Sequence, residues 1–243
     1  MRQRNKERAE KFAKKQGIER AHGSYQELLQ SDDIDVVYIG TIDSLHKQHC
    51  IQAIEAGKHV LCEKALAWNP ADAREMFDAA NRKKVMLQDG MWTRFMPAVE
   101  HARYLMETGK IGEIMTVQAD FDTYYTTQAV SLAFGTEQQP KNLLVGGWHM
   151  GAGGAILEFS QERFAHLTFI SYPSEFPEVT EFIGTKGRIT LEQPAHCPTR
   201  MTLRAPKYAP SRYEDKNKPA PKIHFDFALP EWVTIPDSFP NQE

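Results

Sequence analysis

Short apolar segments alternate with helical patterns through the first half of the chain, which restricts the folds open to it. Residues 35–40 (DVVYIG), 59–62 (HVLC) and 85–87 (VML) have the length and composition of strands. The near-continuous apolar run at 35–40 predicts a strand buried on both faces of a parallel sheet. Strands separated by helices over short connections are typical of a doubly wound α/β sheet.

The intervening helices are predicted from their terminal signals. They are expected at about residues 6–15, 44–56, 70–82 and 97–108. Ser24 and Glu27 form a capping box that predicts an additional short helix. Asn69 and Pro70 are a typical helix cap and first residue, and Gly57 is a typical helix stop. The chain therefore opens on a helix, where a doubly wound fold normally opens on a strand.

The second half changes character at a boundary near residues 109–112. Strands are predicted at residues 114–122, 155–159, 164–171 and 187–191. Residues 184–187 (GTKG) predict the turn between two antiparallel strands. After about Pro194 the chain is rich in Pro and Lys and is predicted to be irregular.

Composition narrows the range of partners and compartments. The 243 residues carry a net charge of −3, which gives no electrostatic footprint for nucleic acid or an anionic membrane. The three cysteines, Cys50, Cys62 and Cys197, are widely spaced and odd in number, which favours a reducing compartment over a disulfide framework. There is no apolar run of transmembrane length, and the N-terminus lacks a signal-peptide core. We therefore expect a cytoplasmic protein.

Ligands of open α/β sheets bind outside the carboxyl ends of the strands, and two segments follow such ends. Gly40 allows close backbone approach, and a helix starting at Ser44 would offer free amides and a positive dipole end to an anion. Glu63 and Lys64 follow strand 59–62 directly. A partly desolvated lysine at this edge is suited to proton transfer.

Each of these residues also has a plainer interpretation. Lys64 can be a solvated strand end, His46 a packing histidine, and Arg94 the partner of a surface carboxylate. Arg4 lies among clustered basic residues that could hold a phosphate or simply face solvent on a helix. What favours Lys64 and His46 is their shared position at one edge of one predicted sheet.

Two further patterns suggest a binding site but do not meet its requirements. Residues 151–155 (GAGGA) are glycine-rich, but a phosphate-binding turn needs a strand before it and a helix after it. A strand follows here, so a flexible turn is predicted. His149, His166 and His196 have no metal-ligand spacing with cysteines or carboxylates, and no metal site is expected.

The motifs together resemble one family. Residues 60–66 (VLCEKAL) resemble the E-K-P signature of the glucose–fructose oxidoreductase and inositol dehydrogenase family (Gfo/Idh/MocA). Residues 91–98 (MWTRFMPA) are closer to one branch, the dimeric trans-dihydrodiol dehydrogenases, also described as NADP-linked D-xylose dehydrogenases. Supporting matches are found at residues 23–29, 109–113, 183–187 and 197–199. The resemblance extends from about residue 4 to about residue 199.

This resemblance implies a fold and a domain organisation. The expected fold is α/β, with an incomplete Rossmann doubly wound parallel sheet followed by an α+β domain with a mainly antiparallel sheet. Residues 1–110 would form the partial dinucleotide-binding domain. Residues 111–200 would form a partial substrate and dimerisation domain, and residues 201–243 an irregular tail. A homodimer through the second-half sheet is expected by the same analogy.

The resemblance also implies an activity and a set of site residues. The branch uses NADP to oxidise trans-dihydrodiols and pyranose sugars, so the substrate would be a small sugar or diol. Lys64 matches the active-site lysine, and Tyr125 matches the tyrosine that exchanges a proton with the substrate hydroxyl. The residues that match cofactor-binding positions are Arg4, Gly40, Thr41, His46, Glu63, Lys64, Trp92 and Arg94. Arg4 matches the basic residue that recognises the 2′-phosphate of NADP.

The chain departs from the family pattern in several places. The first strand and the G-x-G-x-x-G turn are absent, and Ala65 replaces the proline of E-K-P. Residues 120–128 read as though several dozen residues before Tyr125 were spliced out. The sequence therefore predicts a truncated and internally deleted relative. A catalytically inactive fragment or splice form, or a sugar-binding pseudoenzyme, is the alternative to an active NADP-dependent oxidoreductase.

Overall fold

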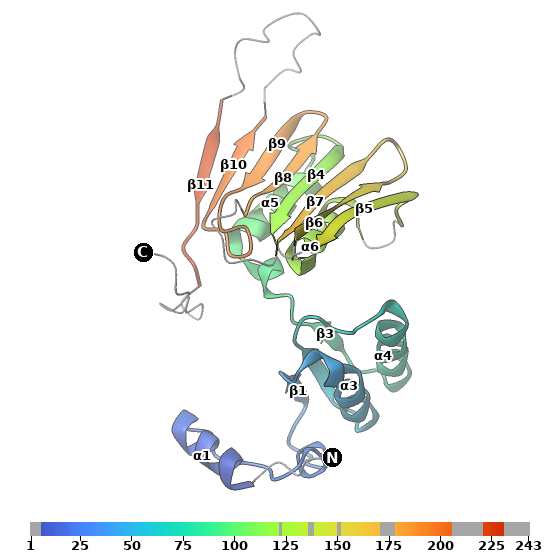
Figure 1. Ribbon diagram of the computed structural model, residues 1–243. Helices are drawn as coiled ribbons and strands as arrows, with labels where there is room; N and C mark the ends of the chain where they lie inside the picture. The colour runs from blue at the N-terminus through green and yellow to red at the C-terminus, as the bar shows by residue number, and fades with distance from the viewer. Residues whose placement is uncertain are drawn as a thin grey trace, which may run out of the picture. The chain divides into compact units, whose positions relative to one another are not determined.

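The computed structural model describes residues 6–121, 123–135, 139–149, 152–170, 178–205 and 221–230. The chain divides into two compact units, Met1–Met91 and Trp92–Glu243, each with its own sheet and hydrophobic core (Figure 1). Within the described ranges, no helix is both long and apolar enough to cross a membrane.

The first unit is built on a small parallel sheet. Its elements are α1 (Lys6–Gln16), α2 (Tyr25–Leu29), β1 (Val36–Ile39), the 3₁₀ turn η1 (Asp43–Leu45), α3 (His46–Glu55), β2 (His59–Cys62), α4 (Pro70–Lys83) and β3 (Leu87–Asp89). The strands pair in parallel in the order β1-β2-β3, which confirms the predicted parallel sheet. Two boundaries differ from prediction: α3 begins after η1, at His46, and β3 lies two residues later than expected.

Local capping explains why the helix predictions in this unit hold. The Asn69 side chain accepts a hydrogen bond from the Asp72 backbone N–H at 2.9 Å, at the start of α4. At α2 the Ser24 hydroxyl accepts from the Glu27 N–H at 3.1 Å, and the Glu27 carboxylate accepts from the Gly23 N–H at 2.9 Å. These bonds satisfy amide groups that a helix start leaves free.

The core of the first unit lies on one side of its sheet. Helix α3 packs on β1 and β2, and α4 packs on α3 and β3. The buried side chains of this core are Ile39, Cys50, Ala53, Ile54, Val60, Cys62, Met76, Ala79, Ala80 and Leu87. On β1, Val36 and Tyr38 are each 59% exposed, so the prediction of a strand buried on both faces is wrong. Among the described residues, helices cover the face of Ile39, and the alternate side chains of β1 stay open.

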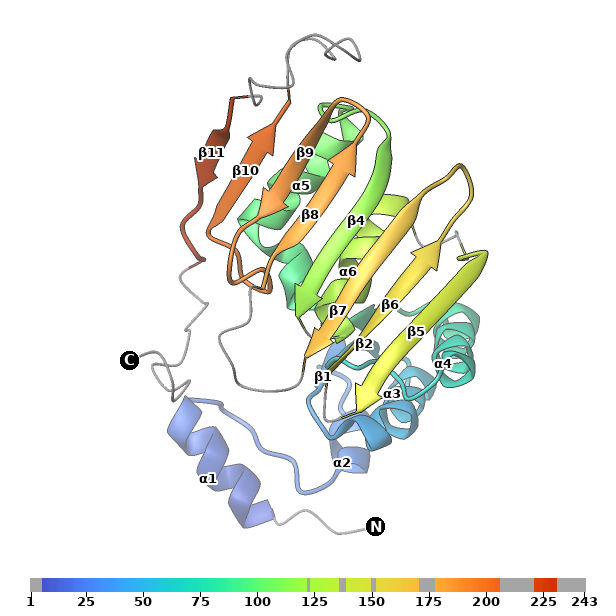
Figure 2. The ribbon, with the colours of Figure 1, turned by 45° about the horizontal axis from the view of Figure 1, so that its top comes forward.

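The second unit is built on a large mixed sheet. Its elements are η2 (Trp92–Phe95), α5 (Pro97–Glu107), β4 (Ile114–Phe121), α6 (Thr123–Phe134), β5 (Asn142–His149), β6 (Ala152–Glu158), β7 (Phe164–Ile170), β8 (Thr180–Gly184), β9 (Gly187–Leu191), β10 (Arg200–Arg204) and β11 (Ile223–Asp226). The strand order is β11-β10-β9-β8-β4-β7-β6-β5, and every neighbouring pair except β4 and β7 is antiparallel. Figure 2 shows α5 and α6 on the same face of this sheet.

Several predictions for the second half need correction. Residues 152–155, predicted as a flexible turn, belong to β6, which pairs with both β5 and β7. Strands β10 and β11 lie in the region predicted to be irregular. That prediction is wrong because each strand gains its hydrogen bonds from a neighbouring strand, which local sequence does not reveal. Helix α6 and strand β5 were not predicted. The turn between β8 and β9 at residues 184–187 is confirmed.

Two motifs of the family resemblance contact each other in this unit. The Thr185 N–H donates to the Glu113 carbonyl at 2.9 Å, and the Lys186 N–H donates to the Ile111 carbonyl at 2.8 Å. A Cβ on Gly184 would overlap the Ile111 carbonyl oxygen, so this turn requires glycine for close backbone approach. The glycines of these motifs therefore fix the β8–β9 hairpin to the loop before β4.

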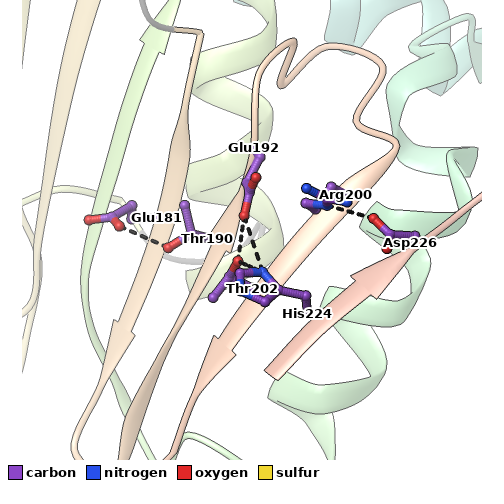
Figure 3. Close-up of polar contacts among 7 residues, drawn as sticks. All are labelled: Glu181, Thr190, Glu192, Arg200, Thr202, His224 and Asp226. Atoms are coloured by element: carbon purple, nitrogen blue, oxygen red, sulfur yellow. Dashed lines mark hydrogen bonds and ion pairs between the residues drawn. The ribbon is translucent and has the colours of Figure 1, made fainter. Parts of the chain in front are cut away.

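The opposite face of the sheet carries a polar row over β8 to β11 (Figure 3). Thr190 donates to Glu181 at 2.9 Å, and Thr202 donates to Glu192 at 2.5 Å. The Nδ1 atom of His224 lies 3.0 Å from the Thr202 hydroxyl. At the edge of the sheet, Arg200 pairs with Asp226 at 2.5 Å. Helices α5 and α6 pack on the other face, and no helix of the described ranges covers this one (Figure 2).

Candidate functional site

The carboxyl edge of the first unit's sheet brings several predicted site residues together. Gly40 and Thr41 follow β1, and Glu63 and Lys64 follow β2, its parallel neighbour. Lys64 is half-buried, and the peptide bond between Lys64 and Ala65 is cis. Parallel strands place their carboxyl ends at one edge, so the two loops form one surface.

The His46 side chain contacts the backbone of both loops. Its Nδ1 lies 2.7 Å from the Ala65 carbonyl oxygen, and its Nε2 lies 2.9 Å from the Thr41 carbonyl oxygen. The side chain is 1% exposed. Carbonyl oxygens only accept hydrogen bonds, so a neutral ring donates to one of the two carbonyls, and the imidazolium donates to both. His46 therefore shapes the edge through the backbone of both loops.

Tyr38 is a part of this edge that the sequence did not reveal. Its hydroxyl donates to Glu63 Oε1 at 2.7 Å, while the Lys64 N–H donates to Glu63 Oε2 at 3.2 Å. The hydrogen bond to the Glu63 carboxylate, followed by partial burial, raises the pKa of Tyr38 to about 12. A Cβ on Gly40 would lie 3.0 Å from the Tyr38 ring, so the small residue leaves the ring its place. A tyrosine two residues before a strand-end glycine was the available signal.

The helix start after β1 differs from the prediction. The Ser44 N–H donates to the Asp43 carboxylate at 2.9 Å, and α3 begins only at His46. A carboxylate at this position occupies an amide that was expected to be free and opposes the approach of a second anion. The Ser44 amide that was expected to bind an anion is therefore paired with the Asp43 carboxylate.

The described residues fit one part of a dinucleotide better than the other. The Thr41 hydroxyl, which lies 3.1 Å from Nδ1 of His49, and the half-buried Lys64 are polar groups of the kind that contact the hydroxyls of a ribose and the carbonyl of a nicotinamide amide. A glycine-rich turn from strand to helix, which would cradle a pyrophosphate, is not found within the described ranges. Arg4, the predicted 2′-phosphate ligand, lies outside the described residues.

The second unit contains a group of four rings from distant segments, which we call the aromatic cluster: Trp92, Phe121, Tyr125 and His196. Trp92 lies edge-on to Tyr125, with ring centroids 5.8 Å apart, and Phe121 stacks on Tyr125 at 5.4 Å. His196 lies 5.2 Å from Phe121, 5.7 Å from Tyr125 and 5.9 Å from Trp92. All four side chains are partly exposed. The cluster thus presents a solvent-reachable aromatic surface.

A carboxylate completes the cluster. Glu178 Oε2 lies 2.5 Å from Nδ1 of His196, and the Thr93 hydroxyl donates to the His196 carbonyl at 2.8 Å. Burial first, and then the charge of Glu178, raises the pKa of the adjacent Cys197 thiol. Sequence reasoning missed Phe121 and Glu178 and considered His196 only as a metal ligand. The match at residues 197–199, next to His196, was the signal that could have drawn attention to it.

Arg94 lies on η2, two residues after Trp92 of the cluster, and is half-buried. In the described part of the chain, no carboxylate lies within ion-pair distance of its guanidinium, so the surface-pair interpretation finds no support there. Across the same residues, no group of three or more His, Cys, Asp and Glu side chains is placed to hold a metal ion.

One cavity among the described residues is not lined by any of the predicted site residues. It has a volume of about 630 Å³ and lies in the first unit, where Asp43 and Ser44 meet residues of α3 and α4. Lys47 crosses it to pair with Asp72 at 2.7 Å and Glu75 at 2.6 Å, beside Trp68. Its polar groups are thus largely paired with one another. The sheet edge is therefore the better candidate for the functional site of this unit.

Comparison with known proteins identifies relatives over most of the chain. Residues 2–91 match the model of an oxidoreductase family with an NAD-binding Rossmann fold, Gfo/Idh/MocA. The chain is 33% identical over 227 residues to a trans-1,2-dihydrobenzene-1,2-diol dehydrogenase from Xenopus laevis, covering 82% of this chain and 68% of that protein. The protein of the same name from Bos taurus is 31% identical over 245 residues, covering 90% and 72%.

Solved structures share the fold. A 3-ketoreductase from Actinomadura kijaniata, in complex with TDP-benzene and NADP, matches with a TM-score of 0.71 and 21% identity, covering 93% of this chain and 73% of that one. An NAD-binding oxidoreductase from Klebsiella pneumoniae matches at 0.76 and 20%, covering 92% and 69%. An inositol dehydrogenase homologue from Azotobacter vinelandii, complexed with NADH and myo-inositol, matches at 0.72 and 16%, covering 91% and 65%. The parallel sheet, the mixed sheet and the sequence relatives agree, and the chain belongs to the Gfo/Idh/MocA family of oxidoreductases.

Proposed function

We propose that this chain acts as an NADP-dependent oxidoreductase on the CH–OH group of a sugar or a trans-dihydrodiol. The observation that carries the proposal is the position of Lys64 at the carboxyl edge of a parallel sheet, in a chain about one third identical to enzymes named dihydrodiol dehydrogenases. Half-burial of Lys64 next to Glu63 supports a role in proton transfer.

Each predicted residue has a proposed role. Lys64 and Tyr125 take the proton from the substrate hydroxyl. Thr41, with Gly40 and Glu63, lines the cofactor edge, and His46 holds its two loops in place. Trp92 and Arg94 bind at the nicotinamide end, and Arg4 binds the 2′-phosphate that distinguishes NADP from NAD. When bound, NADP would supply the acceptor for hydride at C4 of its nicotinamide ring.

Turnover tests this assignment. Oxidation of D-xylose or trans-1,2-dihydrobenzene-1,2-diol is followed by the appearance of NADPH. Lys64→Ala should lower turnover by roughly 10²- to 10⁴-fold, the range typical of a lost general acid–base group, with little change in NADPH binding. Lys110→Ala, at an exposed position, is the matched control and should leave turnover unchanged. Equal turnover in the Lys64 variant and the unmodified chain would refute the role of Lys64.

A second candidate is a non-catalytic, sugar-binding member of the family. It is favoured by one observation, which is that no phosphate-cradling turn is found in the described ranges. This candidate predicts sugar binding without NADPH binding, and the first predicts both.

We propose that two copies associate through the open face of the mixed sheet. Leu144 on β5 and Ile156 on β6 are cross-strand partners, and they are 68% and 41% exposed. Adjacent exposed aliphatic side chains favour a protein interface when they lie, as here, on a sheet face that no helix of the described residues covers. Sedimentation should show a dimer for the unmodified chain and a monomer for Leu144→Lys combined with Ile156→Lys. A monomer in both cases would count against the dimer.

A cytoplasmic location is part of the same proposal. The three cysteines, Cys50, Cys62 and Cys197, are all free thiols, which supports residence in a reducing compartment.

A further inference from the structure

His196 of the aromatic cluster is paired with the carboxylate of Glu178. Neither residue has a role in the proposed proton transfer. Glu178 Oε2 lies 2.5 Å from Nδ1 of His196, and the two side chains are 18% and 22% exposed. An ionised carboxylate only accepts hydrogen bonds, so Nδ1 carries the hydrogen of this contact. In the neutral ring the second nitrogen, Nε2, is then free to accept a hydrogen bond.

The pair is fixed from both sides. The Ala195 N–H donates to the Glu178 carbonyl at 3.0 Å, which ties the two backbone segments together. The Thr93 hydroxyl donates to the His196 carbonyl at 2.8 Å. The imidazole ring lies nearly parallel to Phe121, at an interplanar angle of 21°, and edge-on to Trp92, at 87°. The ring orientation is therefore determined by hydrogen bonds and packing together.

The residue types around the pair are those found in small-molecule sites. Such sites present apolar and aromatic walls with a few polar groups of fixed orientation. Trp92, Phe121 and Tyr125 provide partly exposed ring surface, and His196 provides the fixed polar group within it. A histidine that served only to fill space would not need a carboxylate at 2.5 Å on one nitrogen.

We propose that His196 is a specificity-determining residue, whose Nε2 hydrogen-bonds a hydroxyl of a polyhydroxylated substrate packed on the aromatic cluster. Glu178 is its positioning residue, because it sets which nitrogen of the ring is presented. This inference rests on the proposed function, and it names the substrate class as a polyol or sugar with a hydroxyl to place at Nε2.

Ligand binding tests the role of His196. The probe is D-xylose, titrated by calorimetry in the presence of NADPH, which cannot accept hydride and so gives no oxidation. His196→Phe keeps a ring in the cluster and removes both nitrogens. It should weaken D-xylose binding roughly tenfold, the loss expected for one hydrogen bond. His224→Phe, on the exposed edge strand β11, is the matched control and should bind like the unmodified chain.

The outcomes separate this inference from the proposed function. If the unmodified chain binds D-xylose and His196→Phe binds it equally well, the role of His196 is refuted while the proposed function stands. If the unmodified chain binds neither D-xylose nor the dihydrodiol, the proposed function fails, and the inference fails with it.

A spectroscopic measurement tests Glu178 without relying on substrate. Two-bond ¹⁵N–¹H NMR spectra of the histidine side chains report which ring nitrogen carries the hydrogen. At alkaline pH, His196 should be the Nδ1–H form, and Glu178→Gln should increase the Nε2–H form. Glu178→Asp keeps a carboxylate and should retain more of the Nδ1–H form than Glu178→Gln. A dominant Nε2–H form in the unmodified chain would overturn the proposed positioning.

Discussion

The hydroxyl of Tyr38 donates a hydrogen bond to Glu63 Oε1 at 2.7 Å and so joins β1 to the residue that follows β2. This bond raises the pKa of Tyr38 from 10.0 to about 12. A group whose pKa is raised in the folded state contributes stability fully below its unfolded pKa. The contribution is lost as the pH rises through the folded pKa, here between about 10 and 12.

Tyr38 is therefore expected to ionise late in an alkaline titration. Ultraviolet absorbance of tyrosinate should show a step near the pKa of about 12 that Tyr38→Phe removes. Tyr104→Phe, at an exposed position on α5, is the control and should leave that step in place. Loss of an ordinary tyrosine step near 10 on mutation of Tyr38 would contradict the hydrogen bond.

His46 is expected to be a stability residue as well as a part of the cofactor edge. His46→Ala leaves the Thr41 and Ala65 carbonyls without their ring partner and creates a cavity. It should lower the free energy of unfolding by about 3 kcal/mol. His59→Ala, at an exposed position, removes a single hydrogen bond to the Met86 N–H and should cost about 1 kcal/mol. Urea denaturation measures both, and equal losses would show that His46 does not hold the two loops.

The three thiols are expected to be unreactive while the protein is folded. Cys50 is 0% exposed, and its hydrogen bond to Cys62, followed by burial, raises its pKa. Burial likewise raises the pKa of Cys197. Because the thiolate is the reactive form, a disulfide-exchange reagent should react with all three only after denaturant is added. Rapid reaction of any of them in buffer alone would contradict their burial.

Asp226 is expected to titrate below an ordinary aspartate. Its hydrogen bond to Arg200 on the neighbouring strand lowers its pKa from 3.8 (Figure 3). A lowered pKa contributes stability above the unfolded value, and the contribution is lost as the pH falls through the folded pKa. NMR titration of the carboxyl carbon should show the Asp226 pKa rising in Arg200→Met. Arg188→Met, whose partner is Glu181, should leave it unchanged.

The parts of the fold that were predictable are those set by local chemistry. Helix α4 follows from Asn69 and Pro70, because the capping bond to Asp72 is three residues away. Strands β10 and β11 were not predictable, because each depends on a partner strand distant in sequence. Helix α6 was missed because Thr and Tyr at its start favour strands, whereas packing against β4 and β7 supports a helix.

The candidate site likewise has residues that local sequence identifies and residues that only distant contacts bring together. Glu63 and Lys64 could be located because a short motif directly follows a strand. Tyr38 could not be linked to Glu63, since their contact joins adjacent strands 25 residues apart in sequence. The pairing of Glu178 with His196 spans the β8–β9 hairpin, and no local pattern in the sequence reports it.

The proposed function requires that this chain binds and uses a nicotinamide cofactor. Titration of the purified chain with NADPH, followed by the fluorescence of the reduced nicotinamide, tests it most directly. We expect saturable binding at micromolar NADPH, with weaker binding of NADH. No binding at millimolar NADPH would contradict the claim for this chain.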